Sequence, residues 1–133
     1  MYTPLADSRI YDLVVLLYTE KWPSSISKIR QLLDTAEASR ICKVLIVSAG
    51  WRERVVAAKI IAAFGLSELV AALIGTFSEN PEANTARAFA KLVATTAAPE
   101  LRDGLLGEFR DACPATPYGK NMSVIIAAAA AKS

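Results

Sequence analysis

The chain has 133 residues, of which 53% are hydrophobic and 21% are charged, and its formal net charge is +2. This composition excludes an intrinsically disordered chain, and the mixed order of basic and acidic residues lacks the basic stripe that is typical of nucleic-acid-binding proteins. Histidine is absent, which removes the most common general base and metal ligand. We therefore expect a protein that is not an enzyme and that carries no metal or cofactor.

Targeting and membrane signals are weak throughout the chain. The longest apolar run, residues 124–131, is much shorter than the roughly 20 residues that cross a bilayer. Residues 1–9 contain an acidic residue before the first Arg and no apolar core of signal-peptide type. We expect a single domain, residues 1–133, in the cytoplasm without a membrane span. Cys42 and Cys113 are expected to be reduced thiols, with Cys42 filling the core.

Three helices are predicted before Gly50. The first begins near Asp7, whose side chain can cap it, and runs to about Trp22. Its apolar side chains recur at helical spacing along one stripe: Ile10, Leu13, Val14, Leu17 and Tyr18. Pro23 and the two serines that follow it are expected to end this helix.

A second helix is predicted from about Ser25 to Ala38, and a third from about Arg40 to Ala49. The second helix is expected to face the core with Ile26, Ile29, Leu32 and Leu33. The third segment is rich in β-branched residues, which makes a buried strand the alternative. Because no second strand of similar quality is predicted, we favour a helix. Gly50 is expected to end it in the left-handed conformation.

Residues 58–77 and 90–109 form an internal repeat, and a partial third copy follows at residues 125–128. Eight of the twenty aligned positions are identical: Ala58/Ala90, Lys59/Lys91, Ala62/Ala94, Glu68/Glu100, Leu69/Leu101, Leu73/Leu105, Gly75/Gly107 and Phe77/Phe109. The period is 32 to 33 residues. Such a period is typical of repeat architectures, in which each unit buries its apolar face only against the next unit.

Each repeat is predicted to contain two helices, here called helix A and helix B. In the first repeat, helix A runs from Trp51 to Phe64, Gly65 interrupts the chain, and helix B runs from Ser67 to Phe77. Ser67 is expected to be the N-cap of helix B. The predicted core positions of this repeat are Ala57, Ile60, Ile61, Phe64, Leu69, Val70, Leu73, Ile74 and Phe77.

The second repeat is predicted to start at residues 80–81, where Asn is a good N-cap and Pro suits the first turn. Its helix A runs to about Thr96, with Phe89, Leu92 and Val93 inside. Its helix B covers residues 99–109. A turn-rich loop at residues 114–119 leads to a final helix, residues 121–132, which has no helix B after it.

The repeat unit resembles HEAT and armadillo-type α-solenoids over about residues 51–133. The resemblance rests on an Arg followed by an Ala-rich run in each helix A, at residues 54–58 and 87–90. It implies an all-α fold of about eight helices in antiparallel hairpins, arranged as a short right-handed HEAT-like α-solenoid, and it implies a packing role for the matched residues. The period is shorter than the roughly 40–47 residues usual in that family, and the ankyrin period of about 33 fits better. The Thr-Pro-Leu-His motif of ankyrin repeats is absent, however.

Two groups of charged residues could carry a function. Carboxylates lie three residues apart on the predicted second helix B and just beyond it: Glu100 with Asp103, and Glu108 with Asp111. Arginines are interspersed among them, so a solvated, mixed-charge helix face is favoured over an acid–base pair. The basic residues Arg40, Lys43, Arg52 and Arg54 are near Trp51 in the sequence. Trp and Arg are enriched in interface anchors, and the alternative is that Trp51 packs across Gly50 and the arginines are solvated.

We predict a non-enzymatic protein–protein interaction module, either an immunity protein that neutralises a cognate toxin or a small adaptor. The curved face of the B helices, together with the Trp51 region, supplies the candidate contacts: Glu68, Arg102, Asp103, Glu108, Asp111, Trp51, Arg52 and Arg54. Residues 121–132 are apolar on nearly all sides, so a homodimer through this C-terminal helix is a further expectation. The alternative function is a nucleic-acid-binding helical repeat protein.

Overall fold

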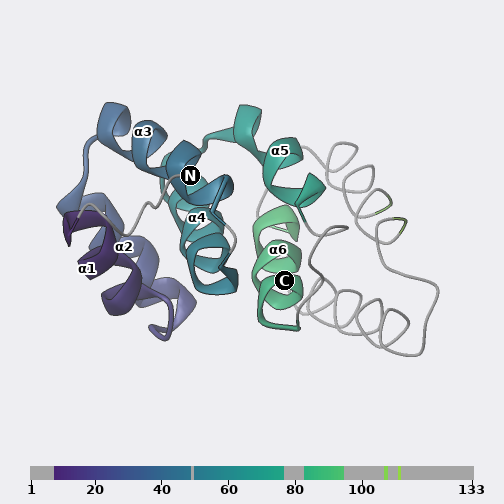
Figure 1. Ribbon diagram of the computed structural model, residues 1–133, viewed down its shortest axis with the longest axis horizontal. Helices are drawn as coiled ribbons and strands as arrows, with labels where there is room; N and C mark the ends of the chain where they lie inside the picture. Colours follow the sequence, from purple (N-terminus) through teal and green to yellow (C-terminus); the bar gives the residue numbers. More distant parts are fainter. Residues whose placement is uncertain (1–7, 49, 77–82, 95–106, 108–110, 112–133) are drawn as a thin grey trace.

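Figure 1 shows the computed structural model of the chain, which describes residues 8–48, 50–76, 83–94, 107 and 111. Within this part of the chain the regular structure is entirely helical: α1 (Ser8–Leu17), α2 (Trp22–Leu32), α3 (Thr35–Ile46), α4 (Trp51–Phe64), a short 3-10 helix η2 (Ser67–Leu69), α5 (Val70–Gly75) and α6 (Ala83–Ala94). The predicted all-α class is therefore confirmed for the described residues. None of these helices is long and apolar enough to cross a membrane.

Helix α4 lies at the centre of this arrangement (Figure 1). It packs against α2, α3 and α6, and touches α1 and α5. Every side chain from Glu53 to Ile61 is buried. The sequence of α4 explains its position, because Val, Ala and Ile occupy positions all around the helix, and a helix that is apolar on every side must be covered on every side.

The turn between α1 and α2 corrects the first predicted helix boundary. Helix α1 ends at Leu17, and not near Trp22, which instead begins α2. Pro23 belongs to the first turn of α2, where its missing N–H group is not needed. Pro23 therefore starts a helix and does not end one. The predicted stripe of α1 is confirmed: Ile10, Leu13, Val14 and Leu17 are buried, and Tyr18 is half-buried.

The boundary between α2 and α3 was also predicted wrongly. The predicted helix from Ser25 to Ala38 is broken, because Asp34 is the N-cap of α3 and its side chain accepts a hydrogen bond of 2.8 Å from the Glu37 N–H. An Asp three residues before a Glu is the pattern of a capping box. Leu32, at the end of α2, is exposed and does not face the core. Residues 40–46 are helical, as predicted, and the strand alternative is wrong.

The two glycines beside α4 have different roles. Gly50 is the N-cap of α4, with φ −84°, so the predicted left-handed conformation is wrong at this position. Gly65 takes φ 64° at the end of α4 and confirms that the helix stops there. The N-cap of the next helical segment is Leu66, and not Ser67 as predicted. The predicted helix B of the first repeat is shorter than expected and consists of η2 followed by α5.

The A helices of the two repeats are α4 and α6, and they pack against each other. Equivalent positions share their burial: Ile60 and Leu92 are buried, as are Ile61 and Val93. Apart from Gly107, the predicted second helix B and the final helix, residues 121–132, lie outside the described residues, as does Cys113. The solenoid arrangement and the number of eight helices are consequently not addressed by the described part of the chain.

Candidate functional site

A cleft of about 360 Å³ lies where the turn between α1 and α2 meets α4 and α6. Residues 18–22 form one wall. Helix α4 contributes Trp51, Val55 and Lys59, which recur every four residues and so lie along one side of the helix. Helix α6 contributes a similar stripe that starts at Asn84 and ends at Lys91. The cleft therefore depends on the packing of three segments that are distant in the sequence.

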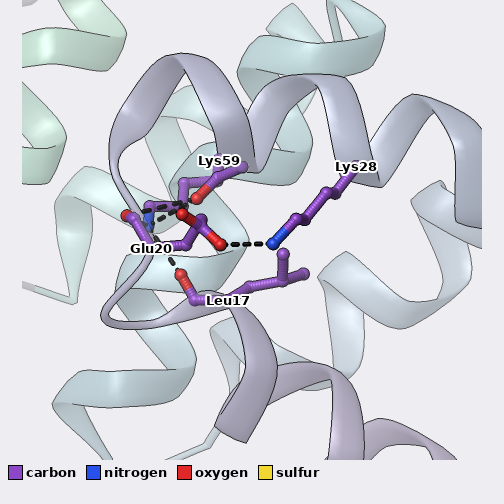
Figure 2. A network of polar contacts seen from close by, with 5 residues as sticks. Leu17, Glu20, Lys28 and Lys59 are labelled. Carbon is purple, nitrogen blue, oxygen red and sulfur yellow. Dashed lines mark hydrogen bonds and ion pairs between the residues drawn. The ribbon is translucent and has the colours of Figure 1, made fainter.

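Lys59 forms the floor of the cleft and holds the turn in place. Its side chain is only 4% exposed, and its ammonium group donates to the Leu17 carbonyl at 2.6 Å, the Glu20 carbonyl at 2.7 Å and Ser25 Oγ at 3.0 Å. Figure 2 shows Lys59 reaching the backbone at Leu17 and Glu20. The three acceptors satisfy all three N–H groups. Leu17 ends α1, so a cation at its carbonyl also compensates the helix dipole.

Burial lowers the pKa of Lys59 to about 8, because the ammonium group is removed from water. The negative charge of Glu20 opposes this effect, whereas the positive charge of Lys91 adds to it and lowers the pKa further. Lys59 and Lys91 are equivalent positions of the internal repeat, one buried in α4 and the other exposed on α6. The repeat thus brings two like charges to one cleft.

Tyr18 and Trp51 pack edge to face at one end of the cleft. Their ring centroids are 5.8 Å apart and their planes meet at 79°. The guanidinium group of Arg52 lies 5.2 Å from the centre of the Tyr18 ring and 4.8 Å from that of Trp51. These distances are typical of cation–π contacts. Tyr18, Trp51 and Arg52, here called the aromatic rim, are joined by contacts that the linear sequence does not reveal.

A third aromatic side chain of the lining, Trp22, lies next to Lys91 of α6. Lys91 Nζ lies 6.0 Å from the centre of the Trp22 ring. On the same side of α6, Arg87 donates from Nη1 to Asn84 Oδ1 at 3.4 Å. Arg87 and Lys91 are four residues apart and both exposed, so their charges are available to a ligand in the cleft.

The lining of the cleft has an excess of positive charge. Among the residues that the structure describes, four cationic side chains line it: Lys21, Lys59, Arg87 and Lys91. Glu20 is the single carboxylate among these described lining residues, and it forms an ion pair with Lys28, from α2 (Figure 2). That ion pair and its hydrogen bond lower the pKa of Glu20. The negative charge of Glu20 therefore acts on both Lys28 and Lys59, and one carboxylate does not balance the positive charge of the lining.

The structure separates the residues that were predicted around Trp51. Trp51 lines the cleft and Arg52 is exposed on the aromatic rim. Arg54 is buried, and within the described part of the chain its Nε and Nη1 have no hydrogen-bond partner. Arg40 and Lys43 are exposed on α3 and do not line the cleft. Arg40, Lys43 and Arg52 are thus exposed to solvent, whereas the buried position of Arg54 does not fit a solvated arginine.

The predicted contacts on the B helices fall elsewhere. Glu68 is exposed on η2 and does not line the cleft. Asp111 is an exposed helical residue. Arg102, Asp103 and Glu108 lie outside the described residues. Sequence reasoning missed Tyr18, Trp22, Lys59 and Lys91 as site residues, and the one signal that could have indicated Lys59 is a cation in the middle of an apolar helix.

Cys42 has the predicted role of core filler. Its side chain is fully buried and its thiol donates to the Ala57 carbonyl at 3.6 Å. Burial raises the pKa of Cys42 to about 12, so the reactive thiolate is not formed near neutral pH. The described residues contain no group of three or more His, Cys, Asp or Glu side chains that could hold a metal ion.

Comparisons with known proteins add no relative to this picture. No protein-family model, no curated protein and no solved structure matches the chain.

Proposed function

We propose that this protein is a non-enzymatic interaction module that binds another protein through the aromatic rim of Tyr18, Trp51 and Arg52. The contact of these three side chains with one another is the observation that carries the proposal. Tyr, Trp and Arg are the residues most enriched among those that dominate binding energies at protein interfaces. Because the rim is already packed in the free chain, a partner would bind it with little further loss of side-chain entropy.

An exposed apolar stripe on α1 supports the proposal that a protein binds at the aromatic rim. Tyr11 is 48% exposed and Val15 is 50% exposed. With Tyr18, they recur at positions i, i+4 and i+7, so they lie along one side of α1 and lead to the aromatic rim. A protein partner that covers the rim would also cover this stripe, whereas a small ligand would leave it in water.

The kind of partner follows from the repeat and its resemblance to HEAT-like solenoids, which are widely used as scaffolds for other proteins. Within the proposal, the partner is a cognate toxin or a client protein in the cytoplasm, and the protein carries out no reaction. Glu68 and Asp111 are exposed and stay candidate contacts of a partner that extends beyond the rim. A homodimer is the competing occupant of the same face.

The proposal is tested by expressing the tagged protein beside its genomic neighbours and measuring the mass of the eluted species by light scattering. Arg52→Glu is compared with Arg40→Glu, because both arginines are exposed but only Arg52 belongs to the aromatic rim. Val15→Glu is compared with Leu32→Glu, because the two side chains are 50% and 49% exposed on different helices. Circular dichroism establishes that each variant is folded.

We expect a stoichiometric heteromeric complex that survives Arg40→Glu and Leu32→Glu and is lost with Arg52→Glu and Val15→Glu. Loss of a charged anchor at an interface centre weakens binding by about 2 kcal/mol or more, which is roughly a 30-fold change in Kd. A complex that persists in all four variants would place the interface elsewhere. A homodimer that the rim variants dissociate would replace the heteromeric partner with a second copy of the chain.

A further inference from the structure

The cleft behind the aromatic rim has a chemical character of its own. Its volume of about 360 Å³ lies within the roughly 300–1,000 Å³ that small-molecule sites occupy. Its walls come from α4, α6 and the turn between α1 and α2. Because Lys59 ties this turn to α4 by three hydrogen bonds, the walls are set before any ligand enters.

The charges of the lining determine whether the cleft binds an anion or a cation. Lys21, Arg87 and Lys91 are exposed and face a cleft whose carboxylate, Glu20, is paired with Lys28. Lys59 adds a fourth positive charge at the floor. Such a lining repels metal cations and cationic ligands and attracts an anion, because like charges in a partly enclosed site raise its electrostatic potential.

The aromatic side chains select the shape of the ligand. Both tryptophans of the chain, Trp22 and Trp51, line the cleft, together with Tyr18. A bare inorganic anion would use the cations and leave these rings unused. A flat ring that carries a phosphate would use both, since stacking on an aromatic side chain contributes about 1–3 kcal/mol per base.

We propose that this cleft binds a nucleoside phosphate, with the phosphate at Arg87 and Lys91 and the base against the aromatic side chains. Arg and Lys are both common phosphate ligands, and Arg can bind two phosphate oxygens at once. The same chemistry is present in a free nucleotide and in one unit of a single-stranded nucleic acid. The site shares Tyr18 and Trp51 with the aromatic rim, whereas Arg52 does not line the cleft.

The electrostatic interaction between Lys59 and Lys91 supports the binding of an anion. Burial lowers the pKa of Lys59, the negative charge of Glu20 opposes this effect, and the positive charge of Lys91 adds to it. A bound phosphate would place a further negative charge near Lys59 and Lys91, and by linkage it would raise the pKa of Lys59. Affinity for the phosphate is therefore expected to fall as the pH rises from about 7 to 9.

Tryptophan fluorescence reports on the cleft directly, because no tryptophan lies outside it. The full-length protein is titrated with AMP, adenosine, inorganic phosphate, a single-stranded oligonucleotide and an oligoglutamate peptide. Lys91→Gln and Arg87→Gln are compared with Lys43→Gln and Arg40→Gln, whose parent side chains are exposed on α3 and outside the cleft. Trp22→Phe and Trp51→Phe identify which ring reports binding.

We expect AMP to quench the fluorescence, with adenosine and phosphate each at least about tenfold weaker, and with Lys91→Gln or Arg87→Gln weakening AMP about tenfold. Lys43→Gln and Arg40→Gln are expected to leave AMP affinity unchanged. If the oligonucleotide binds more tightly than AMP and its affinity falls steeply with salt, the ligand is nucleic acid. If the oligonucleotide and AMP bind with equal affinity, the ligand is the free nucleotide. The proposal is overturned by quenching with oligoglutamate but not with nucleotides, by the absence of quenching at millimolar AMP, or by equal effects of the cleft and α3 variants.

Discussion

At the scale of single residues, Lys59 links the fold to the candidate site. Its three acceptors come from the end of α1, the following turn and the first half of α2, so one side chain joins three segments to α4. A buried cation is costly unless it is fully hydrogen-bonded, and Lys59 meets this condition. The free-energy cost of burying the charge that these hydrogen bonds do not offset lowers the pKa of Lys59.

The pH dependence of stability tests this description of Lys59. The pKa of Lys59 falls from its ordinary value of 10.5 to about 8 in the folded chain. Between these values the unfolded chain binds more protons, so the free energy of unfolding is expected to rise as the pH increases from about 8 to 10.5. This sign is opposite to that of a lysine stabilised by an ion pair, whose contribution would be lost with rising pH.

The free energy of unfolding is measured by urea denaturation at several pH values, for the wild-type protein and for Lys59→Met. The difference between the two proteins gives the contribution of Lys59. Lys43→Met is the control, because Lys43 is exposed on α3 and does not line the cleft. We expect the pH-dependent rise to disappear in Lys59→Met and to remain in Lys43→Met. Parallel curves for all three proteins would show that Lys59 titrates alike in the folded and unfolded chains.

Arg54 is the opposite case, a buried cation that is poorly satisfied. It is 6% exposed, and its Nε and Nη1 groups have no hydrogen-bond partner among the residues that the structure describes. An unsatisfied buried donor costs about 1–3 kcal/mol. Arg54→Met keeps most of the side-chain volume and is expected to raise the free energy of unfolding by about 1 kcal/mol in urea denaturation.

Arg52→Met is the matched control for this substitution, because Arg52 is exposed and contacts aromatic rings. Its loss is expected to lower stability by about 0.5–1 kcal/mol, the usual size of an exposed cation–π contact. A lower stability of Arg54→Met than of the wild-type protein would mean that the guanidinium group stabilises the fold by contacts other than hydrogen bonds of Nε and Nη1.

At the scale of elements, the ends of α4 and α5 offer a comparison of two glycines. Gly65 takes φ 64°, and Gly65→Ala is expected to lower the free energy of unfolding by about 1 kcal/mol, since a Cβ is disfavoured in the left-handed region. Gly75 is the last residue of α5, and a Cβ there meets nothing within 4 Å. Gly75→Ala is expected to raise stability by about 0.5 kcal/mol, because Ala is the better helix former.

Both glycine variants are measured by thermal and urea denaturation. The opposite signs of the two changes are the result that matters, because both add the same methyl group. An unchanged stability of Gly65→Ala would mean that the end of α4 relaxes, so that the left-handed conformation at residue 65 does not restrain the chain.

Helix existence was more predictable from the sequence than helix boundaries. The limits of α4 were predicted correctly because Gly residues flank a long apolar segment. The break at Asp34 was missed, since the apolar positions Ile29 and Leu33 continue a helical pattern through it, and only the pairing of Asp34 with Glu37 indicates a new helix. Pro23 was misread because proline both follows the ends of helices and fills their first turn.

At the scale of the whole molecule, the candidate site could not be predicted because it arises from packing. Trp51 and Arg52 were found from their residue types alone. Tyr18 and Trp22 are distant from them in the sequence, and both were interpreted as parts of one continuous helix. Lys91 was recognised as the repeat equivalent of Lys59, yet the repeat does not tell that one side chain is buried and the other lies over Trp22.

The central claim is that the cleft between the α1–α2 turn, α4 and α6, which the aromatic rim borders, is a ligand-binding site of this protein. The most direct test is a two-dimensional NMR titration of the full-length protein with AMP, which follows the indole N–H signals of Trp22 and Trp51. We predict that both signals shift together and saturate, and that the amides of Leu32 and Val47, outside the cleft, do not move. Shifts confined to other parts of the chain, or no shift of either indole at millimolar AMP, would contradict the claim.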